Sequence, residues 1–512
     1  MPSNQHGVII VGSGLAALAC AARLTEKGVK NISLYATGLG GTPYIAAINF
    51  VLPDNPYGDS PEEYCEDMLH AGYNLGDPCL VREMCDNTVN GYALLRRCGV
   101  QFARKQDGST LLRHVSGHTH PRSLCCTEEL IGVRIFRTLT EWLKEKGVQF
   151  FDGYECLKLL KQDGRTCGIT VRDPSGALSN VYAPVVVAAW GGIGHLLGAS
   201  TYPNDIKGNT LAIAHEAGAE LIDIEFLEYE PMVVLDPPGA VGEPCPTAML
   251  GEGAYLLNSE GERFLLKVRP VGEGGAPKTL INREIWKQVK AGKGSPHGGC
   301  WVDLRHIDRN ILKAYPWFFD RLMENGADPN KQLIEVGPMP HSFSGGIKVD
   351  AGYQSTLPGF YAVGEACGGV HGACRCAGNA ASQATLSGLL CAEAIAKAER
   401  TSVKDELPVE YVADESVYKR FVPDAREIAA NALGIYRAGQ TLLDAEMALL
   451  DILNDPLLRK DDCAYQTILS MRLMVSAALM RKESRGAHMR LDYPDTDKKY
   501  ERTAKRCEAC EG

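Results

Sequence analysis

The chain has 512 residues, of which 45% are hydrophobic and 23% charged, which is enough apolar material for several globular domains. Its formal net charge of −10 is scattered along the sequence, which argues against nucleic acid as a partner because phosphate binding needs a concentrated basic surface. No apolar stretch approaches the length of a signal sequence or spanning helix, and the 18 cysteines lack the spacing of a secreted disulfide scaffold, so we expect a reducing, cytoplasmic location.

The N-terminal region predicts a strand, a glycine-rich turn and a helix. Gly7–Val11 is the strand, Gly12–Ala17 is the turn, and small residues continue as a helix to about Lys27. Ile32–Tyr35 follows as a second strand, so this segment completes a βαβ unit.

The turn carries a dinucleotide fingerprint in its proper context, directly after a strand and before a helix. Gly12 allows the tight turn, Gly14 lets a diphosphate approach the backbone, and Ala17 lets helix and strand pack closely. The helix N-terminus offers free N–H groups and the positive end of its dipole to the phosphates. The acidic residue expected at the end of the second strand is replaced by Tyr35-Ala36, so a ribose needs another partner and NAD is not favoured over FAD.

Later elements are predicted from their boundaries. Ser60 and Asp77 each place a capping side chain before a proline at the first helical position. Val185–Ala189 and Gly359–Glu365 read as strands that run into glycines. From about Glu415 the pattern becomes helical.

These elements predict an α/β protein whose nucleotide-binding fold is split. Between Glu225 and about Gly337 the sequence pattern changes to short strands and turns rich in glycine and proline. Near the C-terminus, apolar residues recur at helical spacing through Ala429–Leu453 and Ala464–Met480. We predict a Rossmann-type FAD-binding domain at 1–230 and 344–400, an inserted α+β capping domain at 231–343 and a helical C-terminal domain at 401–512.

Several ordered segments carry a resemblance that covers most of the chain. They are Gly191-Gly192, Ile224-Glu225-Phe226, Gly251-Glu252-Gly253, Asn258–Phe264, Asp303–His306, His341–Gly346, Gly364-Glu365, His371–Arg375 and Glu483–His488. In these segments the chain resembles the flavoprotein subunits of fumarate reductase and succinate dehydrogenase, and also L-aspartate oxidase. The resemblance runs from about Gly7 to Lys397 and from Ala429 to Pro494, and it implies an FAD-dependent oxidoreductase.

The resemblance implies roles for three cationic or donor side chains. In these families a hydride passes between flavin N5 and a carbon next to a carboxylate, while a side chain moves a proton on the other carbon. Arg375 falls where the family binds the carboxylate, His341 where it places a second donor and Arg283 where it places a proton shuttle. A guanidinium binds a carboxylate through two parallel hydrogen bonds. Arginine is a poor acid, so Arg283 would need a neighbouring relay.

The resemblance also implies where FAD is held. The implied contacts are Gly12, Gly14, Ala17, Gly41, Thr42, Gly192, Gly364, Glu365, Asn379 and Ala380. The histidine that carries a covalent flavin in fumarate reductase maps near Gly41, so we expect FAD to be bound without a covalent link. We expect no metal site.

The chain departs from the family where the second carboxylate of the substrate binds. A histidine donor becomes Glu230. A Thr-Glu pair becomes Pro246-Thr247, and an arginine becomes Leu250. In a closed site the added anion would repel a dicarboxylate by several kcal/mol, so neither succinate nor aspartate is expected as substrate. Glu230 then needs a cationic partner, either a protein residue such as Arg283 or an ammonium or other donor on the substrate.

Two cysteine pairs admit more than one interpretation. Cys374 and Cys376 flank Arg375, so either a thiol lies near the flavin or small side chains fill a tight corner. Cys507 and Cys510 form a CxxC in the tail, which supplies only two of the four ligands of a structural zinc. They are either frayed reduced thiols or a site shared with a partner.

A histidine-rich segment resembles a metal site only superficially. His114, His118 and His120 have ligand-like spacing, but Arg122 follows His118 as in the aspartate oxidase pattern Gly-His-x-x-x-Arg. We therefore expect this segment to line the mouth of the active site.

Three functions remain open. The leading one is an FAD enzyme that acts on a C–C or C–N bond next to one carboxylate of a small substrate. L-aspartate oxidase is favoured by the C-terminal motif and opposed by Glu230 and Pro246. An electron-transfer flavin subunit is opposed by the retained Arg375, His341 and Arg283. The sequence has no haem or ferredoxin motif, so electrons would come from an iron–sulphur or ferredoxin-like protein, a free flavin or the substrate. The chain could also form a homo-oligomer.

Overall fold

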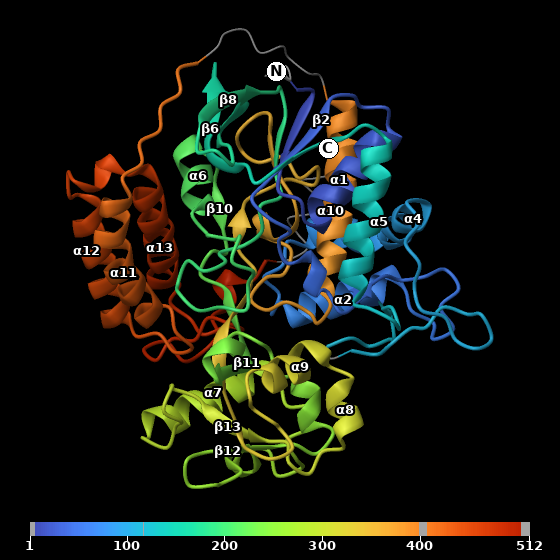
Figure 1. Cartoon of the computed structure of the whole chain (residues 1–512), viewed down its shortest axis with the longest axis vertical. Coiled ribbons are helices and arrows are strands. Elements are labelled where there is room, and N and C mark those ends of the chain that lie inside the picture. The colour runs from blue at the N-terminus through green and yellow to red at the C-terminus, as the bar shows by residue number, and fades with distance from the viewer. Residues whose placement is uncertain (1–5, 116, 399–406, 503–512) are drawn as a thin grey trace.

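The computed structural model describes residues 6–115, 117–398 and 407–502. Figure 1 shows three groups of elements: a Rossmann-type body, a cap body at the bottom of the view and a helical body on its left. The mixture of a parallel sheet with covering helices confirms the predicted α/β class.

A five-stranded parallel sheet forms the core of the Rossmann-type body, in the order β16-β9-β1-β2-β5. Its strands are β1 (Val8–Val11), β2 (Ile32–Ala36), β5 (Gln149–Asp152), β9 (Val186–Ala188) and β16 (Phe360–Ala362). Strands β1, β9 and β16 are fully buried apolar runs, as expected for a parallel sheet covered on both faces. Strand β16 pairs with β9 although the cap body lies between them in sequence, so an insertion splits this fold.

Helices α1 (Leu15–Glu26), α5 (Ile131–Glu145) and α10 (Asn379–Lys397) lie side by side in this body (Figure 1). Small residues allow α1 and α10 to approach closely: a Cβ added at Gly388 of α10 would lie 2.5 Å from the carbonyl oxygen of Ala16. The other helices of this body are α2 (Pro61–Ala71), α3 (Pro78–Asp86), α4 (Thr88–Arg97) and α6 (Thr210–Ala217).

The predicted helix caps are present. Ser60 accepts a hydrogen bond from the backbone N–H of Glu63 at 3.2 Å, and Asp77 accepts one from that of Cys79 at 2.9 Å. The smaller strands of the body pair antiparallel: β6 (Glu155–Gln162), β7 (Arg165–Arg172) and β8 (Leu178–Tyr182); β3 (Ile48–Asn49) with β4 (Ser123–Leu124); and β10 (Leu221–Ile222) with β15 (Gly346–Ile347).

The cap body is built on a four-stranded antiparallel sheet in the order β11-β14-β13-β12. Its elements are β11 (Leu227–Asp236), β12 (Tyr255–Leu257), β13 (Cys300–Asp303), β14 (Ile334–Phe343), α7 (Lys278–Lys290), α8 (Arg309–Lys313) and α9 (Pro316–Glu324). The chain enters this body along β11 and returns along β14, its direct neighbour in the sheet. Side chains on these two strands therefore lie where the two bodies meet.

The helical body contains α11 (Glu415–Ala432), α12 (Gly439–Leu453) and α13 (Asp462–Met480). The helical spacing predicted through Ala429–Leu453 is interrupted, because residues 433–438 form a connection between two helices. By length and composition α13 alone among the described helices is apolar enough to cross a membrane, but 56% of that stretch is buried inside the protein. Since it packs against α6, α11 and α12, its apolar surface is accounted for by this core.

Candidate active site

A cavity of about 530 Å³ extends from the end of β1 to the junction with the cap body. Of the residues predicted from the sequence, it is lined by Gly12, Gly14, Gly41, Thr42, His341, Gly364, Glu365, Arg375 and Ala380. The remaining predicted residues, Ala17, Gly192, Glu230, Arg283 and Asn379, do not line it.

The glycine-rich turn fits a diphosphate. Gly12 has φ +122°, and a Cβ there would lie 2.1 Å from the carbonyl oxygen of Ala189, so only glycine fits. At Gly14 the N-terminus of α1 has no side-chain cap and no acidic residue in its first turn. One of its N–H groups, that of Leu15, donates to Thr42 Oγ at 2.7 Å, and the rest of this end is open to an anion. Ala17 is fully buried and acts through packing.

Strand β2 ends without the acidic residue that would bind a ribose, but two carboxylates from other segments lie at this end of the cavity. Tyr35 is buried against Phe151, with ring centroids 4.3 Å apart, so it packs in the core. Asp205 lines the cavity and accepts a hydrogen bond from the N–H of Gly40 at 2.8 Å. Glu155 also lines the cavity. These two carboxylates lie at the dinucleotide end of the cavity, where Glu155 also pairs with Lys207 at 2.7 Å, and no local pattern in the sequence marks them.

Glu365 holds the segments that meet at the centre of the cavity. Its carboxylate accepts hydrogen bonds from Tyr202 Oη at 2.7 Å and from the N–H of Phe343 at 2.9 Å. Burial raises its pKa. Gly192 acts through this carboxylate, because a Cβ there would lie 2.7 Å from Glu365 Cδ. Asn379 is fully buried, and its Oδ1 accepts a hydrogen bond from Tyr64 Oη at 2.8 Å.

Arg375 presents a guanidinium to the cavity without an acidic partner. Its Nε donates to Ser342 Oγ at 3.1 Å and its Nη1 to the carbonyl oxygen of Cys376 at 3.3 Å, and both acceptors are neutral. The backbone N–H of Arg375 donates to Glu228 Oε1 at 2.6 Å, which fixes the main chain. Within the described residues the guanidinium forms no ion pair, so its charge remains available to an anionic ligand.

Glu230 is neutralised by a residue that the sequence did not reveal. It lies on β11 with a side chain only 6% exposed, and the ammonium of Lys278, the first residue of α7, forms a close ion pair with its Oε2. Of the two alternatives for Glu230, the structure shows a cationic protein residue, and that residue is Lys278 and not Arg283, the example considered, because the first turn of α7 faces Glu230. Lys278 lines the cavity and its side chain is 48% exposed.

His341 on β14 completes this cluster. Its Nδ1 lies 2.8 Å from Thr201 Oγ, and its Nε2 lies 3.8 Å from Glu230 Oε2. Burial, helped by the nearby cations Lys278 and Arg375 and opposed by Glu230, lowers its pKa to about 4. The imidazole is therefore neutral near pH 7 and serves as a hydrogen-bonding group.

Arg283 lies further along α7 and is not among the residues that line the cavity. Its Nε is buried and has no hydrogen-bond partner among the described residues. In the described part of the chain Arg283 forms no ion pair with a carboxylate that could act as its proton relay. Leu250, the other substituted position, is 4% exposed and belongs to the apolar core of the cap body, so it contributes no polar group to the cavity.

The C-terminal segment 483–488 supports the loop that carries Arg375. The N–H of Ala487 donates to the carbonyl oxygen of Ala373 at 2.9 Å, two residues before Arg375. A Cβ at Gly486 would lie 2.3 Å from that same oxygen, so the two backbones are in direct contact. The segment that resembles the families' helical-domain motif thus acts beside the site and does not line it.

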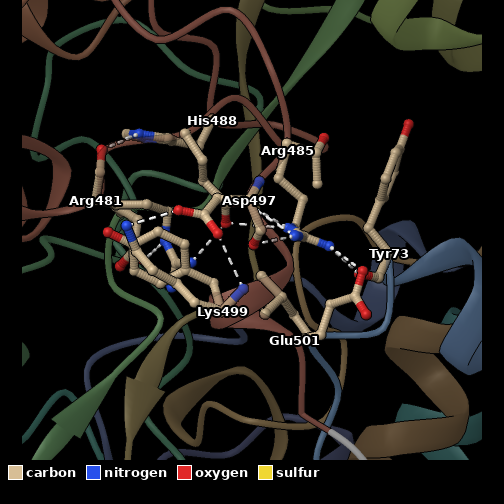
Figure 2. A network of polar contacts seen from close by, with 12 residues as sticks. Tyr73, Arg481, Arg485, His488, Asp497, Lys499 and Glu501 are labelled. Atoms are coloured by element: carbon tan, nitrogen blue, oxygen red, sulfur yellow. Dashed lines mark hydrogen bonds and ion pairs between the residues drawn. The ribbon is translucent and has the colours of Figure 1, made fainter.

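A buried polar network holds this segment in place (Figure 2). Arg485 donates to both oxygens of Glu483 at 3.0 Å and to the carbonyl oxygens of Tyr73 at 2.8 Å and Asp497 at 2.9 Å. Arg485 and Glu483 are buried. Because Tyr73 belongs to the Rossmann-type body, the network ties the C-terminal segment to that body.

The histidine-rich segment lies beside the Arg375 loop. Val115 of this segment lines the cavity, whereas its histidines and Arg122 do not. Arg122 is fully buried and pairs with Asp59 and Asp67, each at 2.6 Å, since an arginine in the core needs carboxylate partners. His118 Nε2 lies 2.8 Å from the carbonyl oxygen of Ala377, which lines the cavity. The segment therefore buttresses the site.

The cysteines beside Arg375 are protonated thiols. Burial raises the pKa of Cys374, and raises that of Cys376 to about 12. Cys376 Sγ donates to the carbonyl oxygen of Gly117 at 3.2 Å, so it fills a packed corner. Cys507 and Cys510 lie outside the described residues.

Two known protein families match parts of the chain. Residues 7–381 match the family described as FAD binding domain, and residues 464–507 match the one described as Fumarate reductase flavoprotein C-term.

Individual relatives span nearly the whole chain. L-aspartate oxidase of Streptomyces coelicolor is 31% identical over 96% of this chain and 89% of its own length. A fumarate reductase (CoM/CoB) chain of Methanothermobacter marburgensis is 29% identical over 97% of this chain and 96% of its own length. Among solved structures, Sdh1 of Mycobacterium smegmatis in complex with UQ1 superposes with a TM-score of 0.84 at 26% identity, over 97% of this chain and 90% of that one.

Proposed function

Because this chain belongs to the family of FAD-dependent oxidoreductases that includes L-aspartate oxidase and the flavoproteins of fumarate reductase and succinate dehydrogenase, we propose that it moves a hydride between FAD and a carbon adjacent to a carboxylate, in a substrate that is not a simple dicarboxylate.

The observation that carries this proposal is the asymmetry of charge in the cavity. On the Rossmann-type side the guanidinium of Arg375 has only neutral acceptors, so it favours one carboxylate. On the cap side of the same cluster Glu230 and Lys278 form a pair with no net charge, and Leu250 is buried in the cap core. A second carboxylate would have to compete with Glu230 for the ammonium and would face its repulsion.

The side chains can be assigned complementary roles. When bound, FAD supplies the hydride chemistry, and the turn at Gly12 and Gly14 holds its diphosphate. Arg375 orients the carboxylate, and the neutral His341 contributes a hydrogen bond close to it. The cap, proposed to comprise 231–343, excludes water from the substrate.

A substrate panel tests the proposal. Oxidised enzyme would be mixed anaerobically with succinate, L-aspartate and L-alanine, and photochemically reduced enzyme with fumarate and crotonate, while flavin absorbance is followed. We expect faster reaction with monocarboxylates than with the dicarboxylates. Efficient turnover of fumarate or succinate would show that the interpretation of Glu230 is wrong.

L-aspartate oxidase is the second candidate, favoured by the 31% identity with the Streptomyces coelicolor enzyme. Rapid flavin reduction by L-aspartate, with release of ammonia, would select it.

We further propose that electrons are exchanged with an iron–sulphur or ferredoxin-like protein. A cytoplasmic location fits the free thiols found at most cysteines of the described part of the chain.

A further inference from the structure

Cys79 differs from the other cysteines of the described chain. It forms a disulfide, whereas every other cysteine within residues 6–115, 117–398 and 407–502 is a free thiol. The remaining cysteines of the sequence are Cys507 and Cys510, which lie outside the described residues and which we call the tail pair. In a chain so rich in free thiols a single disulfide indicates a redox-active bond, because disulfides of reducing compartments are mostly transient, catalytic or redox-sensing.

The last described residues bring the tail pair within reach of Cys79. The backbone N–H of Arg502 donates to the carbonyl oxygen of Asn74 at 2.9 Å, and its Nη1 donates to that of Leu75 at 2.6 Å. Cys79 is half-buried and lies four residues beyond Leu75, at the second position of α3. The two tail cysteines follow Arg502 by five and eight residues, which span at most about 17 and 27 Å.

Arg502 also holds a strained turn. Tyr73 and Asn74 both have φ in the left-handed region, at 55° and 57°, which is unfavourable for residues other than glycine. Partners from the C-terminal segment compensate for this strain. Arg485 Nη1 donates to the carbonyl oxygen of Tyr73 at 2.8 Å, and Arg502 donates to the next two carbonyl oxygens. The conformation of the turn therefore depends on how firmly Arg502 is held.

The same turn, residues 72–77, supports the loop that carries Arg375. The carbonyl oxygen of Gly72 accepts a hydrogen bond from the N–H of Ala373 at 3.0 Å. The N–H of Asp77 donates to the carbonyl oxygen of Gly369 at 2.7 Å. Because Ala373 lies two residues before Arg375, a shift of the turn changes where the guanidinium points, and misplacement by about 1 Å is enough to slow a reaction.

We propose that Cys79 and the tail pair form a thiol–disulfide switch, whose bond holds Arg502 against the turn and so keeps Arg375 in its substrate-binding position. Cys79 forms the bond with one tail cysteine, and the other tail cysteine is the resolving thiol. The switch goes beyond the proposed reaction, and only its effect on turnover rests on the proposed function.

The exchange conserves electrons. The resolving thiol loses its proton to water, and its thiolate attacks the tail sulfur of the disulfide. A bond forms within the tail pair, and Cys79 leaves as a thiolate that takes up a proton. The N-terminus of α3 stabilises this leaving group, and a CxxC spacing closes a disulfide readily. A dithiol reductant then supplies two electrons and two protons to the tail pair and becomes a disulfide itself. Glutathione disulfide reverses the reduction and leaves as two thiols.

The test compares oxidised and reduced full-length holoenzyme. One sample is equilibrated with glutathione disulfide and the other with dithiothreitol, and both are desalted under anaerobic conditions. Alkylation with N-ethylmaleimide and peptide mass mapping identify the partner of Cys79. Amide hydrogen exchange of residues 72–77 and 369–376 reports on the turn and the loop without any substrate. The fourth quantity is kcat/KM for the best member of the substrate panel.

Three variants are measured in both states. Cys79→Ser removes one side of the bond, and the double variant Cys507→Ser/Cys510→Ser removes the other. Cys463→Ser is the matched control, because Cys463 is also half-buried and lies at the second position of a helix with an aspartate cap, but is a free thiol.

We expect oxidised wild type to contain a bond between Cys79 and the tail pair of the same chain. Reduction should speed hydrogen exchange in both segments and lower kcat/KM about fivefold or more, the lower end of coupling between two sites, with FAD content unchanged. Cys79→Ser and the double tail variant should behave as reduced enzyme in both states. Cys463→Ser should keep the full response of the wild type.

Three results would overturn the proposal. Alkylation of Cys79 as a free thiol after treatment with glutathione disulfide would show that the bond does not form. A bond between two chains would make Cys79 a contact of an oligomer. Unchanged hydrogen exchange and kcat/KM after reduction would make the bond a structural cross-link only. Failure of the proposed function is distinguishable, because it appears as absence of reaction in the wild type, whereas peptide mapping and hydrogen exchange need no substrate.

Discussion

Replacing Arg375 with methionine should abolish turnover while leaving the fold and the FAD content near normal. The guanidinium donates only to neutral acceptors, Ser342 Oγ and the carbonyl oxygen of Cys376. Losing these two bonds costs about 1–2 kcal/mol of stability, and no buried carboxylate is left unpaired. The backbone bond to Glu228, which fixes the loop, is kept by any residue at this position.

The effect on turnover follows from the bond proposed with the substrate. Truncating one partner of a desolvated charge pair costs about 2–5 kcal/mol. At about 1.36 kcal/mol for each factor of ten, kcat/KM should fall between about 30-fold and about 5,000-fold. Arg375→Lys should recover little of this loss, because an ammonium cannot reproduce two parallel hydrogen bonds.

Three quantities are measured for the wild type and each variant. They are kcat/KM for the best member of the substrate panel, the flavin-to-protein absorbance ratio and the unfolding midpoint. Turnover within about threefold of wild type in Arg375→Met would refute the carboxylate-binding role. Loss of FAD or a large drop in the unfolding midpoint would instead make Arg375 a structural residue. The Lys variant separates charge from geometry, since full recovery would mean that a point charge is enough.

Three further predictions concern cofactor attachment, folding and pH. Acid precipitation should release all FAD into the supernatant, and flavin retained in the pellet would show a covalent link. Arg485→Met should lower the free energy of unfolding by about 2–3 kcal/mol in urea titrations, because the buried Glu483 loses the donor to both its oxygens but keeps Arg481 at 2.9 Å, whereas Lys499→Met on the exposed side of the same network should change little. Because burial lowers the pKa of His341 from 6.5 to about 4 and that of His371 to about 3, the folded state resists their protonation. Below pH 6.5 the unfolded chain binds protons at these two histidines and the folded chain does not, so the free energy of unfolding decreases as the pH falls toward 4. The thermal midpoint should therefore drop over this range, and less steeply in His371→Gln.

Local patterns in the sequence predicted the elements whose geometry is decided locally. The turn at Gly12 needs a positive φ and room for a carbonyl group, so glycine spacing identifies it. The caps at Ser60 and Asp77 satisfy N–H groups two or three residues away and are visible for the same reason. Helical spacing was less reliable, because it cannot show that the connection at 433–438 separates two packed helices.

The ion pair of Glu230 could not be predicted, although the need for a cation could. A buried carboxylate requires a partner, and that requirement follows from its position alone. The identity of the partner depends on how α7 lies against β11, two elements whose paired residues are 48 positions apart. Arg122 shows the same limit: its motif indicated the neighbourhood of the site, but Asp59 and Asp67 draw it into the core.

The division of the site between two bodies explains how hydride chemistry can be kept while the substrate changes. The residues proposed to face the cofactor and the carboxylate, including Gly12, Glu365 and Arg375, line the cavity from the Rossmann-type body, whose sheet fixes their positions. Glu230 and Lys278 belong to the cap, on β11 and α7. Under the proposed function, substitutions in the cap exchange a dicarboxylate-binding region for a neutral ion pair without moving Arg375, the group proposed to orient the reacting carbon. The fold specifies the residues of the Rossmann-type body, whereas the residues of the cap are free to vary. Membership of the family therefore assigns the reaction type, and the substrate is best identified from the Glu230–Lys278 pair.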